Sequence, residues 1–138
     1  MEASIKWIKE YGFLAKSASG HALLMDAPVA SGGNNLGPSP MEVVLLGAAG
    51  CMSYDIVNIV RKSRHDIREC SAQLIAEQAP EVPRVFTKIE FKFTLEGNLT
   101  REQVQKAIDL SAEKYCSVSI MLGKTADISF SFEIILPS

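Results

Sequence analysis

The chain has 138 residues, which is enough for one domain with a single hydrophobic core. Apolar residues make up 47% and charged residues 22%, a composition that excludes an intrinsically disordered chain. Fourteen basic residues against sixteen acidic ones give a net charge of −2, so no positive surface is expected for nucleic acid or an anionic membrane. We therefore expect one folded domain, residues 1–138, that binds neither.

The cysteines and the N-terminal sequence indicate the cellular compartment. Cys51, Cys70 and Cys116 are odd in number and widely spaced, unlike the cysteines of a secreted disulfide scaffold, so reduced thiols are expected. The N-terminal stretch does not combine a basic start, an apolar run and a small-residue cleavage site. We expect a cytoplasmic protein.

The N-terminal part predicts a small β-meander followed by a loop. Between residues 5 and 26, short apolar stretches are separated by turn residues at 11–12 and 19–20, which is typical of short strands. Residues 27–39 concentrate glycine, proline, asparagine and serine, which predicts a loop. Loops of this length more often have a function than not.

A long helix is predicted over residues 40–62. Ser39 is the expected N-cap, a proline follows at the first helical position, and Glu42 completes a capping box. The helix is apolar on nearly every face, but Glu42, Asp55 and Asn58 interrupt it. A membrane span is not expected, because it needs ~18 or more uninterrupted apolar residues.

A helix of this composition must be buried on most of its surface. One sheet built from the rest of the chain is too small to cover it. We therefore expect an obligate homodimer in which the helix over residues 40–62 packs against its counterpart in the partner.

The second half of the chain predicts strands over residues 67–78, 84–96 and 127–136. In the second of these, apolar residues alternate with charged ones, as in a half-exposed antiparallel strand. The inward residues are expected to be Val85, Thr87, Ile89, Phe91, Phe93 and Leu95 in that strand, and Ile128, Phe130, Phe132, Ile134 and Leu136 in the last.

An amphipathic helix and a short helix lie between the last two strands. Thr100 and Gln103 form a second capping-box pattern, and a short helix over residues 117–122 ends at Gly123. The inner face of the amphipathic helix is expected to contain Val104, Ala107, Ile108, Ser111, Ala112 and Tyr115. The fold class is therefore α+β: antiparallel sheets packed on a long buried central helix and a second amphipathic helix.

From the residues alone, the cysteines leave catalysis and packing both open. Cys51 lies in the middle of a helix, where a free cysteine usually packs as a small apolar residue. Cys116 lies between two predicted helices, where backbone N–H groups of the following turn favour the thiolate. Cys70 lies on a strand and is interpreted as a packing residue. Asp55 follows Cys51 by one turn on the same helix face, where its charge opposes thiolate formation.

Metal and cofactor sites are not expected. His21 and His65 stand apart from each other and from the cysteines, so neither a Cys-His pair nor a metal motif is present in the sequence. We expect no cofactor.

Two cysteine-containing motifs resemble those of the OsmC/Ohr family of thiol peroxidases. They are GPSPMEVVLLGAAGC, ending at Cys51, and YCSVS around Cys116, and the resemblance covers roughly residues 20–135. It extends to Gly32-Gly33 and to the strand over residues 83–89. The resemblance implies an intertwined α+β homodimer with sites at the subunit interface. It also implies that Cys51 is the peroxidatic thiolate and that Cys116 resolves the sulfenic acid as a disulfide.

The chain departs from the best-known members of that family in the pair of residues that activates the cysteine. Those members use an arginine from the N-terminal strands and a glutamate directly after the helix-start proline. Here no arginine precedes Arg61, Met41 follows the proline, and the acid is Glu42. Arg84, contributed by the same or the other subunit, is our hypothesis for the missing cation. The chain therefore resembles a divergent OsmC-like subgroup.

The resemblance implies a hydroperoxide reductase that acts in oxidative-stress defence. The thiolate displaces alkoxide from the O–O bond, a second thiol forms a disulfide, and an external dithiol reduces it. An apolar wall around the helix cysteine favours organic hydroperoxides. The alternatives are a non-catalytic module that binds an apolar or electrophilic small molecule, and a thiol redox sensor.

Overall fold

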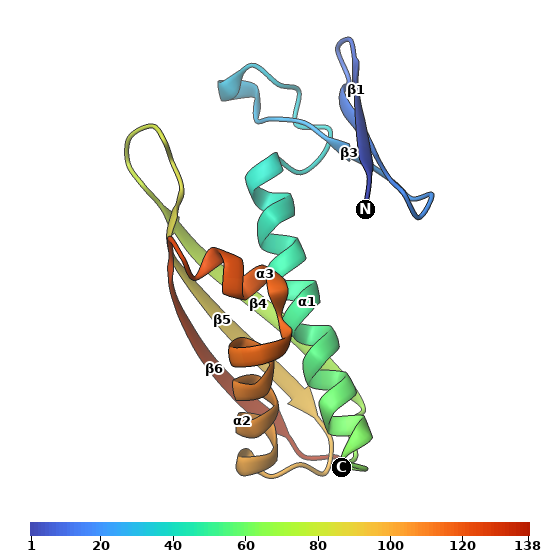
Figure 1. Ribbon diagram of the computed structural model, residues 1–138, viewed down its shortest axis with the longest axis vertical. Coiled ribbons are helices and arrows are strands. Elements are labelled where there is room, and N and C mark those ends of the chain that lie inside the picture. The colour runs from blue at the N-terminus through green and yellow to red at the C-terminus, as the bar shows by residue number, and fades with distance from the viewer. The chain divides into compact units, whose positions relative to one another are not determined.

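The computed structural model describes all 138 residues, which form two units, residues 1–46 and 47–138. The first unit contains a three-stranded antiparallel meander and a loop (Figure 1). Strands pair in chain order, with Trp7 opposite Phe13 and Phe13 opposite Met25. The predicted meander and loop are confirmed, with one turn of 3₁₀-helix inside the loop. The elements are β1 (Ala3–Ile8), β2 (Gly12–Ser17), β3 (Ala22–Met25) and η1 (Val29–Ser31).

The Asp26 side chain holds the loop against the end of β3. Its carboxylate accepts hydrogen bonds from the backbone N–H groups of Asn34 and Leu36, each at 3.1 Å. These hydrogen bonds hold the pKa of Asp26 below its ordinary value. The largest contribution comes from the backbone N–H of Leu36 and the next from that of Ala27. At Gly33 the backbone passes so close that a Cβ would collide with the Ala27 carbonyl. The loop therefore has a defined path.

Helix α1 (Pro40–Lys62) begins and ends as the sequence predicts. The capping box is present: the Ser39 N–H donates to Glu42 Oε1 at 3.1 Å and the Glu42 N–H to Ser39 Oγ at 3.3 Å. By length and composition alone, α1 meets the criteria for a membrane span, as core helices of globular proteins also do. Its fully buried residues form a stripe of one residue per turn: Ala48, Met52, Ile56 and Val60.

The rest of the α1 surface is only partly covered within the chain. Val44, Leu46 and Tyr54 are 39%, 62% and 72% exposed. The expectation of a helix buried on most of its surface is therefore not met by one chain, and the homodimer stays a prediction.

The second unit contains a mixed three-stranded sheet with helices over one face (Figure 1). Strand β4 (Glu69–Gln78) pairs antiparallel with β5 (Phe86–Glu96), and β5 pairs parallel with β6 (Asp127–Ile135). The α+β class is confirmed, but the expectation of antiparallel sheets throughout is wrong. Helix α2 (Arg101–Leu110) carries the chain from β5 to the start of β6, and such a crossover produces a parallel pair.

A β-bulge changes the predicted facing of β5 at its start. Gln78 pairs with Phe86 and Glu77 with Lys88, so Thr87 is the extra residue of the bulge. The bulge reverses the alternation, which puts Phe86 in the core and leaves Val85 and Thr87 exposed, contrary to the prediction. From there on the prediction is confirmed, because Ile89, Phe91, Phe93 and Leu95 are all buried. In the last strand the four residues predicted inward from Ile128 to Ile134 are half-buried, while Leu136 lies beyond β6 and is exposed.

The amphipathic helix ends in a turn of π-helix, η2 (Ser111–Tyr115), before the short helix α3 (Ser117–Leu122). The α2 capping box of Thr100 and Gln103 is confirmed, as is the burial of Val104, Ala107, Ile108 and Ser111. Tyr115 is exposed, contrary to the prediction, because the wider π turn shifts the face that the following residues present.

Candidate functional site

The second unit brings two thiols and one carboxylate together. Cys51 and Asp55 lie one turn apart on α1, and helical side chains lean toward the N-terminus, so Asp55 lies over the turn that carries Cys51. Cys116 follows η2. The Cys51 Sγ, the Cys116 Sγ and a carboxylate oxygen of Asp55 lie within 4.8 Å of one another. We refer to these three residues as the thiol cluster.

The π turn positions Cys116 against α1. Its backbone N–H donates to the Ser111 carbonyl at 2.7 Å, the five-residue bond that defines the turn. Ser111 is fully buried, and its hydroxyl donates to Asp55 Oδ2 at 2.8 Å. This bond fixes the carboxylate beside the sulfurs. Such π turns occur frequently at functional sites.

The two thiols differ in exposure. Cys116 is fully buried, while Cys51 is half-buried. Burial raises the pKa of the Cys116 thiol, and its hydrogen bond with Cys51 and the Cys51 charge raise it further. Ser119 opposes this shift, and its N–H donates to the Cys116 Sγ at 3.4 Å. The backbone N–H group expected from the following turn is present and lowers the pKa of Cys116, but burial is the larger effect and the net shift of that pKa is upward.

Open space lies next to Cys51 on the helix. Gly47 is one turn before Cys51 on the same face, toward which the cysteine side chain leans. A Cβ built on Gly47 would meet no atom within 4 Å. Of the two thiols, the half-buried Cys51 is therefore the one that a small molecule can reach, because Cys116 is fully buried.

The other residues proposed from the sequence lie outside the thiol cluster. Glu42 is engaged in the α1 capping box. Arg84 is exposed in the connection between β4 and β5, where its Nε donates to the Ala79 carbonyl at 3.1 Å. Their catalytic roles stay predictions. Cys70 lies half-buried on β4 as a free thiol, and burial raises its pKa.

Two residues of the site were not identified from the sequence. Asp55 was considered only as a charge that opposes thiolate formation, although its four-residue spacing from Cys51 places both on one helix face. Ser111 was assigned to the inner face of the second helix. The available signal for a special role was that Ser111 is a polar residue within a buried stripe. Its hydrogen-bond partner, however, is 56 residues away in the chain and is brought close only by the tertiary fold.

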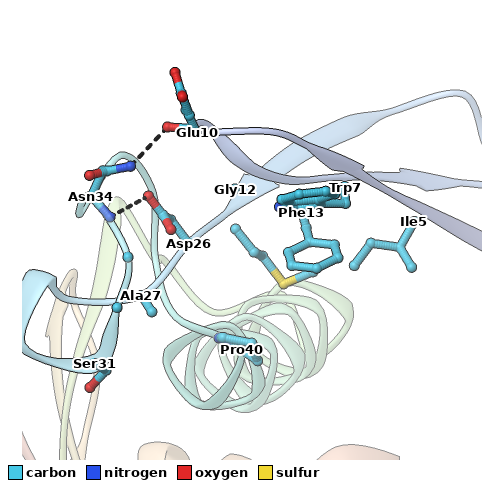
Figure 2. Close-up of a pocket in the computed structure, with 13 residues that line it drawn as sticks. Ile5, Trp7, Glu10, Gly12, Phe13, Asp26, Ala27, Ser31, Asn34 and Pro40 are labelled. Atoms are coloured by element: carbon cyan, nitrogen blue, oxygen red, sulfur yellow. Dashed lines mark hydrogen bonds between the residues drawn. The ribbon is translucent and has the colours of Figure 1, made fainter.

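The first unit contains a separate pocket of about 500 Å³. Figure 2 shows Ile5, Trp7 and Phe13 on one side of it and Asp26 and Asn34 on the other. The side-chain amide of Asn34 donates to a backbone carbonyl of the β1–β2 turn at 2.9 Å. The pocket therefore has an apolar wall and a polar rim.

The family model described as OsmC-like protein matches residues 32–131. Protein YhfA of Escherichia coli (strain K12) is 44% identical over 136 residues, 98% of each chain. A solved structure of a hypothetical protein from Aquifex aeolicus VF5 is 26% identical, with a TM-score of 0.87 over 99% of this chain and 97% of that one. An organic hydroperoxide resistance protein OsmC from Legionella pneumophila shares the fold at 14% identity, with a TM-score of 0.71 over 96% of this chain and 95% of that one. This chain therefore belongs to the OsmC-like protein family.

Proposed function

We propose that this chain is a cytoplasmic hydroperoxide reductase in which Cys51 attacks the peroxide and Cys116 resolves the oxidised thiol. The observation that carries the proposal is the proximity of the two sulfurs, which lie within 4.8 Å of each other although Cys51 is on α1 and Cys116 lies between η2 and α3. Rotation of the side chains can bring two sulfurs at this separation close enough to form a disulfide, whereas thiols on elements far apart would need the backbone to move. Support also comes from the family, which includes an organic hydroperoxide resistance protein.

The exposure of the thiols supports the division of roles. The half-buried Cys51 is accessible to a peroxide, whereas Cys116 is fully buried. The nucleophile must meet the substrate, while the resolving thiol needs to meet only the oxidised sulfur.

The reaction proceeds in three steps. The Cys51 thiolate attacks the terminal oxygen of the hydroperoxide, breaks the O–O bond and forms a sulfenic acid, and the alkoxide leaves and takes up a proton. The Cys116 thiolate then attacks the Cys51 sulfur and expels hydroxide, which becomes water on protonation. An external dithiol reduces the disulfide by two thiol exchanges and is itself oxidised to a disulfide.

Oxidation of Cys51 prepares Cys116 for its role. Burial is the largest cause of the raised pKa of Cys116, and it is unchanged by the oxidation. The negative charge of a Cys51 thiolate, which also raises that pKa, disappears once the Cys51 sulfur is a neutral sulfenic acid. The resolving thiol therefore ionises more easily after the first step than before it.

We predict that disulfide formation accelerates with rising pH. Because the pKa of Cys116 is raised, its thiolate fraction at neutral pH is small and grows about tenfold per pH unit until the pKa is reached. The rate after one equivalent of hydroperoxide is measured by acid quench and mass spectrometry. A rate that is already constant below pH ~7.5 contradicts a raised pKa, since an ordinary thiol ionises only near 8.5.

Turnover of cumene hydroperoxide and hydrogen peroxide with excess dithiothreitol or dihydrolipoamide tests the function. The chelator EDTA is present throughout, so that metal ions do not occupy the thiols. The expected result is sustained consumption, faster for the organic peroxide. Consumption equal to the dithiol-only blank overturns the proposal, while a single equivalent without turnover supports a redox sensor.

We also propose that the protein is a homodimer through the exposed surface of α1. Leu46 and Tyr54 are large side chains left 62% and 72% exposed on a helix with few charges. Sedimentation velocity is expected to show a dimer for the wild type and a larger monomer fraction for Leu46→Glu. A wild type that sediments as a monomer at micromolar concentration contradicts this prediction.

A second candidate function is binding of an apolar small molecule in the pocket of the first unit. The pocket volume of about 500 Å³ and its apolar wall are typical of ligand sites. The two functions are distinguished with Cys51→Ser: a binding module retains its ligand in this variant, whereas a reductase loses its activity.

A further inference from the structure

We propose that the thiol cluster is also a binding site for a divalent zinc ion, with Cys51, Cys116 and Asp55 as ligands. The inference does not depend on the proposed function, because it concerns the reduced cluster in the absence of peroxide. The sequence offers no metal motif, since the third ligand comes from a segment 61 residues beyond Asp55 in the chain.

The ligand set suits zinc. Two thiolates and one carboxylate are all established ligands of this ion, and soft sulfur ligands disfavour magnesium and calcium. In a tetrahedral zinc site, ligand atoms are about 3.5–3.8 Å apart, given Zn–S and Zn–O lengths of about 2.3 and 2.0–2.2 Å. The three donor atoms lie within 4.8 Å of one another, so a contraction of about 1 Å, within reach of side-chain rotation, forms the site.

The surroundings supply the hydrogen bonds that metal ligands require. Ser111 donates to one carboxylate oxygen of Asp55 at 2.8 Å, which fixes that group and leaves its other oxygen for the ion. The Ser119 N–H donates to the Cys116 Sγ at 3.4 Å and so stabilises negative charge on that sulfur. The side chains of Asp55 and Cys116 are therefore held in place before an ion binds.

Two of the three proposed ligands are partly exposed. Cys51 and Asp55 are half-buried rather than closed off, and a Cβ at Gly47 would have no neighbour within 4 Å. Three protein ligands leave a fourth position for water or a small anion, as in zinc sites that keep an open position.

Zinc binding releases protons from the two thiols. Each neutral thiol loses one proton, so one zinc ion and two thiols give a zinc dithiolate and two protons. A bound ion also shields both sulfurs from electrophiles, because their lone pairs are engaged.

Zinc titration of the fully reduced, chelator-stripped protein under anaerobic conditions tests the site, with a chromophoric chelator as competitor. We expect one zinc per chain in the wild type and in the matched control Cys70→Ser, whose thiol lies on β4 outside the cluster. Ser111→Ala is expected to weaken binding about 10–100-fold, as loss of a hydrogen bond to a metal ligand does. Cys51→Ser and Asp55→Asn are expected to weaken it by at least as much.

Cobalt substitution and alkylation give independent readings. Co²⁺ is expected to produce the sulfur-to-metal charge-transfer band and visible bands of a tetrahedral thiolate site in the wild type and Cys70→Ser, and weaker charge transfer in Cys51→Ser. Zinc is expected to protect the half-buried Cys51 from iodoacetamide, while Cys70, which is also half-buried but lies outside the cluster, stays reactive.

The inference is overturned if the wild type binds less than one equivalent, or if Cys51→Ser and Asp55→Asn bind zinc as tightly as Cys70→Ser. Circular dichroism confirms that each variant is folded. Because turnover is assayed in EDTA, absence of peroxidase activity leaves the zinc result intact, and absence of zinc binding leaves the peroxidase result intact.

Discussion

Replacing Cys51 with serine is expected to reduce hydroperoxide turnover to the dithiol-only rate. A serine hydroxyl is not ionised at neutral pH and does not form the sulfenic acid on which the cycle depends. The loss is on the order of 10³-fold or more, the scale found when a nucleophile is removed from an enzyme. Peroxide consumption with excess dithiothreitol measures it, with Cys70→Ser as the matched cysteine control.

Cys116→Ser distinguishes attack from resolution. This variant is expected to consume one equivalent of hydroperoxide and to accumulate a Cys51 sulfenic acid that dimedone traps, because the thiol that forms the disulfide is gone. If Cys116→Ser fails to react while Cys51→Ser reacts, the two roles are reversed. If Cys70→Ser loses activity as well, the chemistry is not confined to the thiol cluster.

Replacing Phe91 with alanine is expected to destabilise the protein by about 3–5 kcal/mol, the range for deletion of a buried aromatic ring. Phe91 is fully buried on β5, with ring centroids of Phe93 and Phe130 at 5.9 and 5.2 Å. The remaining cavity is bordered by strands whose ladder hydrogen bonds keep them from collapsing into it. Urea unfolding at equal chain concentration measures the loss.

Lys88→Ala on the same strand is the control for this prediction. Lys88 is exposed, so its truncation is expected to change the free energy of unfolding by no more than about 0.5 kcal/mol. A Phe91→Ala loss under about 1 kcal/mol would mean that the core of the second unit is not packed as described.

Local patterns predicted most of the elements because the signals for them are short-range. The capping box at Ser39 and Glu42 and the second one at Thr100 and Gln103 both form as expected, since each involves residues three apart. The bulge at Thr87 was not predictable in this way. It depends on how β4 pairs with β5, which alternation within one strand does not encode.

The candidate site was predicted only in part for a related reason. The resemblance paired Cys51 with Cys116, and the structure places their sulfurs together. The roles of Asp55 and Ser111 follow from a hydrogen bond between α1 and η2, which no spacing along the chain specifies. The direction of the Cys116 pKa shift likewise depends on burial, a property of the tertiary fold.

The π turn before Cys116 makes the site sensitive to chain length rather than to residue type. In this turn the backbone N–H of Cys116 donates to the carbonyl of Ser111, five residues earlier. Both residues face α1, where Ser111 bonds to Asp55 and the Cys116 sulfur lies near that of Cys51. Deleting one exposed residue between them, such as Lys114, would replace the five-residue turn with a four-residue helical turn and change the spacing at which Ser111 and the cysteine face their partners on α1. Substitutions at the same exposed positions keep the spacing. Homologous proteins that share this arrangement should therefore vary freely in the identity of these residues but conserve their number.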